Sequence, residues 1–316
     1  MPLIEENVII CGIIKNCGRT LSSNMERCVE TGGLFNKCKI VIYENNSTDN
    51  TKEVLNLLKI NHPIKVISED IPMETIKKNS RIWAYTAITG SDHPCRIEQI
   101  SNARNKVLEE INKPDYDEYK YVMWIDLDSA GWDINGIYDS FKKKSDWDIV
   151  YANGQNSGGG FYDRYAFRDS THLFGPEITG DYFWNHLPTL NFNKETKLIP
   201  VYSSFGGVGI YKKEIFKQIK YDCIVNSDMK KFYNNIFKNN TLQSYCDKID
   251  KTLYNIVCSE DTKFIGGEKD VVNNIFWKNN SGYNNLVVCE HVCFNLAAIN
   301  AGYKIFINPK MVYKWI

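Results

Sequence analysis

The sequence has no window of about eighteen uncharged apolar residues, the length that a membrane-spanning helix needs. Its first residues, MPLIEENVIICGII, also lack the basic region and the following apolar segment of a secretory signal peptide. We therefore expect a cytoplasmic protein with no integral membrane segment.

Excess charge of either sign is absent, because Lys+Arg and Asp+Glu both number 38. No overall electrostatic field draws such a chain to nucleic acid or to an anionic membrane. We therefore predict no nucleic acid partner, although the balance does not exclude a local basic patch.

The ten cysteines lack the paired spacing of a zinc finger. Cys11 and Cys38 lie within apolar runs, and Cys289 and Cys293 stand four positions apart without a second pair. We interpret the cysteines as small core residues of a protein in a reducing compartment, not as a disulfide framework.

Two glycine-rich phosphate-binding patterns are also missing. No G-x-G-x-x-G follows the first apolar run, which argues against a dinucleotide-binding site. The glycines at 158–160 are not followed by the Lys-Ser or Lys-Thr of a phosphate-binding loop. We interpret that glycine run as a loop.

Short apolar runs alternate with segments of helical periodicity through the first half of the chain. Residues 8–14, 39–43 and 64–67 have the composition of strands. Between them, residues 21–29 and 54–58 carry apolar side chains at helical spacing. This alternation predicts an α/β fold with a Rossmann-like, mostly parallel central sheet flanked by helices.

The second half of the chain is less regular. Residues 70–97 read as irregular, and a helix is expected over 100–111. Residues 153–200 form a long Gly- and aromatic-rich segment, which we interpret as substrate-facing because long loops in compact domains usually carry function. Further strands are expected at 148–152, 200–204, 286–289 and 304–308, a short helix from 212, and a helix at 290–301.

The most informative stretch, YKYVMWIDLDSAGWD, covers residues 119–133. Residues 121–125 predict a buried strand that ends in Asp126 and Asp128. Side chains alternate along an extended chain, so both carboxylates should point to one side while Leu127 points into the core. Such a pair suits a divalent cation that also binds substrate phosphates, and a solvated turn is the alternative.

Several short motifs in chain order carry a resemblance to a known family. They are YENNSTDNT at 43–51, RIEQISNARNKVL at 96–108, YDRYAFRD at 162–169, VYSSFGG at 201–207 and CEHVCF at 289–294. With Asp126-Leu127-Asp128 as an Asp-x-Asp metal motif, the chain resembles nucleotide-sugar glycosyltransferases of the GT-A fold. It is most similar to the fungal capsule (cryptococcal) mannosyltransferase-like family, whose members usually carry a membrane anchor.

The resemblance implies one GT-A domain over 1–316. Residues 1–152 would form the nucleotide-sugar-binding half, and residues 153–316 the acceptor-binding half with an insertion at about 222–285. It implies Mn²⁺ or Mg²⁺ as cofactor, a UDP- or GDP-hexose as donor, and a glycan or glycoprotein as acceptor. The residues it assigns are Glu290 as catalytic base; Glu44, Asn45, Asp49, Arg104, Asn105, Asp126 and Asp128 for the donor; Asp163, Gly206 and Gly207 for the acceptor; and Asp126, Asp128 and His291 for the metal.

Each assignment has a structural alternative. The NNSTD turn that includes Asp49 makes a good helix cap, Arg104 could be a solvated helix residue, and the paired glycines could form a plain turn. Glu290 could be a helix-start acid favoured by the helix dipole. For the whole chain, the alternatives are a nucleotidyltransferase that uses the same acids, and an inactive carbohydrate-binding protein of the same fold.

Overall fold

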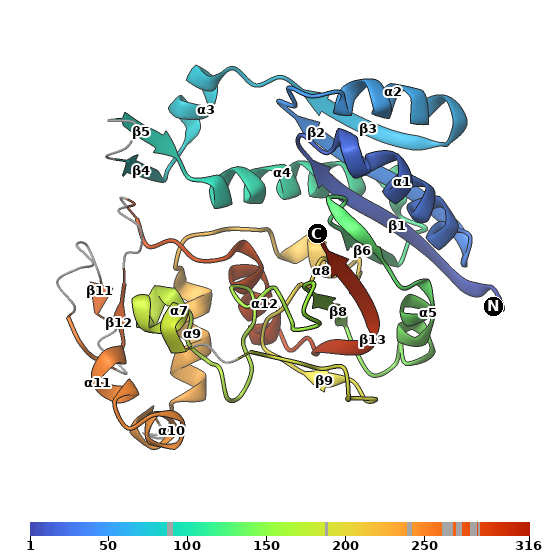
Figure 1. The fold of residues 1–316 in the computed structure, drawn as a ribbon. Coiled ribbons are helices and arrows are strands. Elements are labelled where there is room, and N and C mark those ends of the chain that lie inside the picture. The colour runs from blue at the N-terminus through green and yellow to red at the C-terminus, as the bar shows by residue number, and fades with distance from the viewer. Residues whose placement is uncertain are drawn as a thin grey trace.

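The structure is a computed structural model that describes residues 1–86, 91–186, 189–238, 242–260, 268–269, 274–278, 283 and 285–316. Its centre is one large mixed sheet with the strand order β3-β2-β1-β6-β10-β8-β13-β7, and β9 pairs with β13 (Figure 1). The strands are β1 (Ile4–Ile14), β2 (Phe35–Asn45), β3 (Ile64–Glu69), β6 (Tyr121–Ile125), β7 (Ser129–Trp132), β8 (Ile149–Gln155), β9 (Ile199–Pro200), β10 (Val208–Lys212) and β13 (Ile305–Trp315).

Most strands of this sheet run in one direction. Strands β3, β2, β1 and β6 are parallel neighbours, and β8 and β13 form a further parallel pair. Strand β10 runs antiparallel between β6 and β8, and β7 and β9 run antiparallel to β13. The predicted α/β fold with a mostly parallel central sheet is therefore confirmed.

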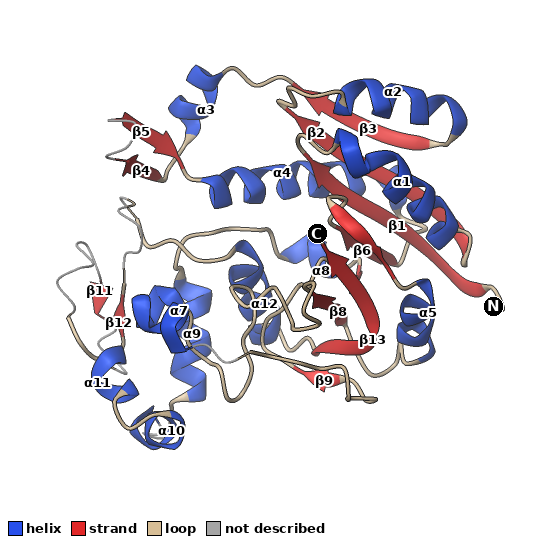
Figure 2. Cartoon of the chain, in the orientation of Figure 1, coloured by secondary structure: helices blue, strands red, loops and turns tan. Residues whose placement is uncertain are grey.

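Helices cover both faces of the sheet (Figure 2). In β6, Met123 and Ile125 face a core shared with α1 (Gly18–Gly32), α2 (Thr51–Asn61) and α5 (Ile134–Lys142). Val122 and Trp124 face a second core shared with α4 (Arg96–Ile111) and α12 (Glu290–Asn300). A strand buried on both faces needs apolar side chains at every position, which explains the unbroken apolar run before Asp126.

Smaller elements gather beside the sheet. Figure 1 shows α7, α9, α10 and α11 on the side of the molecule away from β1, β2 and β3. The remaining elements are α3 (Met73–Asn79), β4 (Trp83–Thr86), β5 (Ser91–Pro94), η1 (Pro114–Tyr116), α6 (Pro176–Thr179), α7 (Asp181–His186), α8 (Ile215–Gln218), α9 (Ser227–Ile236), α10 (Leu242–Ile249), α11 (Leu253–Val257), β11 (Glu268–Lys269) and β12 (Phe276–Trp277). Helices α9, α10 and α11 fall in the predicted insertion, part of which lies outside the described residues.

The strand predicted at 286–289 was wrong, and of the strand predicted at 200–204 only Pro200 lies in one, β9. Residues 286–289 are buried but lie outside the large sheet. Val287 makes an isolated bridge with Ile224 instead. An apolar run indicates burial, and it cannot by itself indicate which partner a strand would have. The strand β10 was missed because its start follows directly on the glycines at 206–207, which read as a strand-to-helix turn.

The burial of the cysteines agrees with their interpretation as small core residues. Eight of the ten cysteines are buried, Cys38 and Cys258 are half-buried, and all ten are free thiols. Among the helices that the structure describes, none combines the length and the apolar character needed to cross a bilayer.

The segment at 153–200 is largely packed into the core. Phe161, Phe167 and Leu173 are buried in the core on the α4 side of the sheet. The segment is fixed by a fully buried ion pair in which Arg168 Nη2 lies 2.9 Å from Glu177 Oε1. Arg168 Nη1 also donates to the carbonyls of Tyr165 and Phe167. A buried guanidinium with these partners ties the irregular chain to one conformation.

Replacing Glu177 by Gln should destabilise the protein by about 3–5 kcal/mol, because the Arg168 guanidinium would stay buried without its counter-charge. Urea unfolding followed by circular dichroism measures the change. Glu118→Gln is the matched control, since it removes the exposed partner of Lys37 and should leave the free energy of unfolding nearly unchanged. Similar stabilities for the two variants would contradict an anchoring role for the buried pair.

Candidate active site

Three strands meet at the carboxyl end of β6. The Asp126 amide donates to the carbonyl of Gly207, just before β10, at 2.9 Å. The Tyr313 hydroxyl from β13 donates to the Asp126 carbonyl at 3.2 Å. Leu127 is buried in the core, as predicted, while Asp128 is exposed and the Asp126 side chain keeps 30% of its surface exposed. The two carboxylates therefore stand at the edge where α/β sheets bind ligands.

Helix α1 holds the turn that carries these acids. The Leu127 carbonyl accepts bonds from the Asn24 amide at 2.8 Å and from the Thr20 hydroxyl at 3.0 Å. The Asn24 amide also donates to the carbonyl of Ser129 at 3.0 Å. Side chains on a helix thus fix the backbone between Asp126 and Asp128, which a solvated turn would not require.

Arg104 reaches from α4 to a position between two acids. Its Nη2 lies 3.6 Å from Asp126 Oδ1, and its Nε lies 3.4 Å from Glu290 Oε1. The guanidinium is 4% exposed and is enclosed by the rings of Trp124, Phe205 and Tyr221, at 4.9–5.5 Å from the ring centroids. The alternative of a solvated helix arginine is therefore wrong.

Asn105 supports this arrangement from the next position of α4. Its amide nitrogen donates to the Tyr221 carbonyl at 2.8 Å, and its amide oxygen accepts from the Tyr221 amide at 2.9 Å. Both ends of the side chain are thus used to hold Tyr221, whose ring encloses Arg104.

Glu290 and His291 begin α12, and both are buried. His291 stacks on Phe205 with ring centroids 4.0 Å apart, and its Nε2 lies 3.5 Å from Glu290 Oε1. Neither ring nitrogen has a hydrogen-bond partner among the described residues. Burial, aided by the nearby Arg104, lowers the pKa of His291 well below its usual range, so the ring is a neutral imidazole.

Asp163, Gly206 and Gly207 lie together. The Asp163 carboxylate accepts from the Gly206 amide at 3.0 Å. Both glycines have positive φ, 64° and 85°. A Cβ at Gly206 would come within 2.4 Å of the Ala152 carbonyl oxygen, and one at Gly207 within 2.3 Å of the Tyr313 ring. Glycine is therefore required here by close backbone packing as well as by conformation.

The acids near Asp126 outnumber the bases. Burial raises the pKa of Asp126 to about 7, and Asp128, Asp163 and Glu290 add to the rise against the opposing effect of Arg104. Burial likewise raises the pKa of Asp163 to about 6. Four carboxylates around a single guanidinium favour a bound cation.

A divalent cation fits this donor set. Carboxylate oxygens and a neutral imidazole are ligands that Mn²⁺ accepts, and both imidazole nitrogens of His291 lack a hydrogen-bond partner within the described part of the chain. No group of three or more His, Cys, Asp or Glu side chains that could hold a metal ion is present among those residues, so Asp126, Asp128 and His291 do not together form a ready three-ligand site. An ion bound here would take only part of its ligands from the protein.

The loops after β1 and β2 are joined to each other. Asp49 accepts from the Gly18 amide and from the Thr51 amide, both at 3.0 Å. Glu44 is fully buried and accepts from the Ser47 amide and the Ser68 hydroxyl, while the Asn45 amide donates to Asn46. Asp49 lies near Asp126 and Asp128, since it accepts from the Gly18 amide while Thr20, two residues further on, donates to the carbonyl of Leu127.

A group of aromatic side chains beside Asp126 was not predicted from the sequence. Tyr162 stacks on Trp315 with ring centroids 5.5 Å apart and an interplanar angle of 11°, and Tyr313 lies 6.1 Å from Tyr162. Tyr313 and Trp315 share one side of β13, which was expected to end at residue 308 because Pro309 follows. The alternation of large aromatics after that proline was the signal for a longer strand.

Comparisons with known proteins were made by sequence and by fold. A family model described as cryptococcal mannosyltransferase 1 matches residues 7–255, which is more than half of the chain. A search of curated proteins found no match.

Solved structures with a similar fold include S. aureus TarS 1-349, at 12% identity and a TM-score of 0.38, with 76% of this chain and 55% of that chain covered. They also include the mannosyltransferase PcManGT from Pyrobaculum calidifontis in complex with GDP-Man and Mn²⁺, at 12% identity and 0.38, with 70% and 50% covered. GalNAc-T7 with UDP, GalNAc and Mn²⁺ is similar at 13% identity and 0.47, with 99% and 44% covered. The chain thus spans about half the length of these solved chains.

The family match covers most of the sheet, including β6 and the Asp126-Leu127-Asp128 stretch, and it ends before Glu290 and β13. Together with the mixed sheet flanked by helices, it confirms the predicted GT-A fold class and the glycosyltransferase assignment at the level of the family. The chain belongs to the cryptococcal mannosyltransferase family, the family that its sequence motifs resemble.

Proposed function

We propose that the protein is a metal-dependent glycosyltransferase, which moves a hexose from a UDP- or GDP-sugar to a hydroxyl of a glycan or glycoprotein. The observation that carries the proposal is the cluster of carboxylates around Arg104 at the carboxyl end of β6. Because the family model is described as a mannosyltransferase, GDP-mannose is the first donor to test.

Asp126 and Asp128 would hold Mn²⁺ or Mg²⁺ against the donor diphosphate, and His291 would join them only if donor binding brings the three side chains together, since they do not form a three-ligand site as they stand. The bound ion would neutralise the charge that grows on the nucleoside diphosphate as it leaves. Of the three, Asp128 is exposed and open to a ligand from solvent, whereas Asp126 and His291 are held by the surrounding backbone and rings. The loops that carry Glu44, Asn45 and Asp49 would receive the nucleoside, since Asp49 fixes the loop after β1 beside the metal motif.

Glu290 would act as the general base. As the acceptor oxygen bonds to the anomeric carbon and the bond from that carbon to the diphosphate breaks, the Glu290 carboxylate would take the proton of the acceptor hydroxyl. This role supposes inversion at the anomeric carbon. If Glu290 is not the base, the alternatives are a retaining mechanism or another base such as Asp163 or Asp181, of which Asp163 lies in the same acidic cluster and accepts from the Gly206 amide.

Arg104 would set the geometry of this step. Its guanidinium contacts the acid proposed as a metal ligand and the acid proposed as the base, at 3.6 Å and 3.4 Å. The surrounding aromatic rings prevent it from turning toward solvent. Arg104 would thereby keep Asp126 and Glu290 at a fixed distance from each other, with the acceptor hydroxyl between them.

Donor turnover should require a divalent metal. We expect excess chelator to abolish nucleoside diphosphate release, Mn²⁺ to restore it, and Asp128→Asn to stay folded but to bind Mn²⁺ weakly in calorimetric titrations. Asp146→Asn, which changes an exposed acid on the opposite end of the sheet, is the control and should behave as the parent protein. Activity in excess chelator, or full activity of Asp128→Asn, would remove the metal from the proposal.

Glu290→Gln keeps the shape of the side chain and loses its basicity. We expect kcat to fall by roughly 10²–10⁴-fold while the KM for the donor stays nearly unchanged, because a general base acts in the chemical step and not in donor binding. Steady-state kinetics with a hexoside acceptor measures both constants. Glu195→Gln, at an exposed position, should leave them unaltered. A near-normal kcat for Glu290→Gln would make Glu290 only a helix-start acid.

A further inference from the structure

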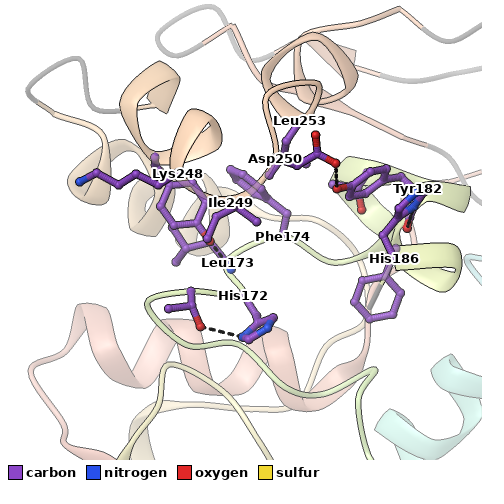
Figure 3. A pocket seen from close by; sticks show the side chains of 13 residues that line it. His172, Leu173, Phe174, Tyr182, His186, Lys248, Ile249, Asp250 and Leu253 are labelled. Atoms are coloured by element: carbon purple, nitrogen blue, oxygen red, sulfur yellow. Dashed lines mark hydrogen bonds between the residues drawn. The ribbon is translucent and has the colours of Figure 1, made fainter. Parts of the chain in front are cut away.

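A concave site lies between residues 171–186 and the helices α10 and α11 (Figure 3). Its volume is about 460 Å³, which falls within the range of pockets that bind small molecules. None of the residues proposed for catalysis, donor or metal lines it. Its lining includes His172, Phe174, Tyr182, His186, Tyr245 and Asp250.

One wall of the pocket is a flat aromatic surface. Tyr182 and His186 stand one helical turn apart on α7, and their rings stack with centroids 4.0 Å apart and an interplanar angle of 11°. The Tyr182 hydroxyl donates to Asp250 at 2.7 Å, which fixes the ring from the other side of the pocket (Figure 3). A rigid aromatic face of this kind suits the apolar C–H face of a sugar ring.

The polar groups of the pocket favour a ligand that donates hydrogen bonds. His172 Nδ1 bonds the Asp169 carboxylate at 3.0 Å, and His186 Nδ1 bonds the Tyr182 carbonyl at 3.1 Å. In each ring Nδ1 is therefore the donor, and the Thr171 hydroxyl and the Asp250 carboxylate also line the pocket. Lys248 is the only lysine or arginine among the described residues that line it. A phosphate or other anion would meet a carboxylate and a single lysine here, whereas sugar hydroxyls would find oxygen acceptors.

Helix α7 connects this pocket with the proposed catalytic site. On the helix, Trp184 lies between Tyr182 and His186 in sequence, does not line the pocket, and packs against Tyr165 with ring centroids 6.0 Å apart. Tyr165 is two residues from Asp163, whose carboxylate accepts from the Gly206 amide in the acidic cluster. The contact between Trp184 and Tyr165 therefore joins the helix that lines the pocket to the segment that carries Asp163.

We infer that this pocket is a distal acceptor subsite, which binds a hexose unit of a neutral oligosaccharide acceptor away from the unit that receives the new sugar. The inference rests on the proposed glycosyltransferase function and adds a preference for oligosaccharide over monosaccharide acceptors. Its ligand is recognised by the stacked Tyr182 and His186 and by the oxygen acceptors of Thr171 and Asp250.

The test measures sugar binding and turnover separately. Saturation-transfer NMR on the whole protein without donor uses methyl α-mannoside and an α-linked mannotriose as probes. Ile249→Trp obstructs the pocket from an exposed position on its rim, and Ile60→Trp makes the same change at an exposed position on α2. His186→Ala removes half of the stacked pair, and His62→Ala is its control at the end of α2.

We expect mannotriose to bind the parent protein and both controls, and to bind Ile249→Trp and His186→Ala at least tenfold more weakly. In acceptor assays the same two variants should lose at least tenfold in kcat/KM with mannotriose and keep their kcat/KM with methyl α-mannoside. Donor cleavage without acceptor should be equal in all five proteins.

Two results would overturn the inference: no mannotriose binding by the parent protein, or equal binding by Ile249→Trp and Ile60→Trp. Either result would leave donor cleavage intact if the proposed function is right. Loss of donor cleavage in the parent protein would instead contradict the proposed function, and the NMR comparison would still decide whether the pocket binds the sugar.

Discussion

The buried guanidinium of Arg104 is the constraint on which the site depends. Its charge is withdrawn from water among three aromatic rings, and its counter-charges are the carboxylates of Asp126 and Glu290. Removing one partner of a buried pair typically destabilises a protein by about 3–5 kcal/mol, so α4, the end of β6 and the start of α12 are held together by one charge. A lysine would not replace it, because only the planar guanidinium stacks against rings while it contacts two acids.

The backbone around this charge is equally constrained. Gly206 and Gly207 allow the start of β10 to pack closely on Ala152 and Tyr313. The Gly207 carbonyl accepts a hydrogen bond from the Asp126 amide. On the other side, the Asn295 amide of α12 donates to the Ser203 hydroxyl and the Ser204 carbonyl at 3.0 Å. Glu290 and the two glycines are thus fixed to the same stretch of chain, which suits a site that must hold donor and acceptor in one geometry.

The sequence predicts the parts of this site that depend on local patterns. Residues 121–125 form the expected strand, and Leu127 points into the core, because burial on both faces and side-chain alternation are both visible in a short window. The aromatic enclosure of Arg104 could not be predicted, since Trp124, Phe205 and Tyr221 come from separate segments that only the folded chain brings together. The pocket beside α7 was hidden for the same reason: its walls come from segments separated by about 70 residues.

The central claim is that the acids at the end of β6 serve hexosyl transfer. The most direct measurement is ³¹P NMR of the protein incubated with GDP-mannose, Mn²⁺ and a mannoside acceptor, with mass spectrometry of the acceptor. The account predicts one GDP released for each hexose added to the acceptor. Pyrophosphate as product would indicate nucleotidyl transfer, and an unchanged spectrum for every UDP- and GDP-hexose tested would indicate a carbohydrate-binding protein; either result would contradict the account.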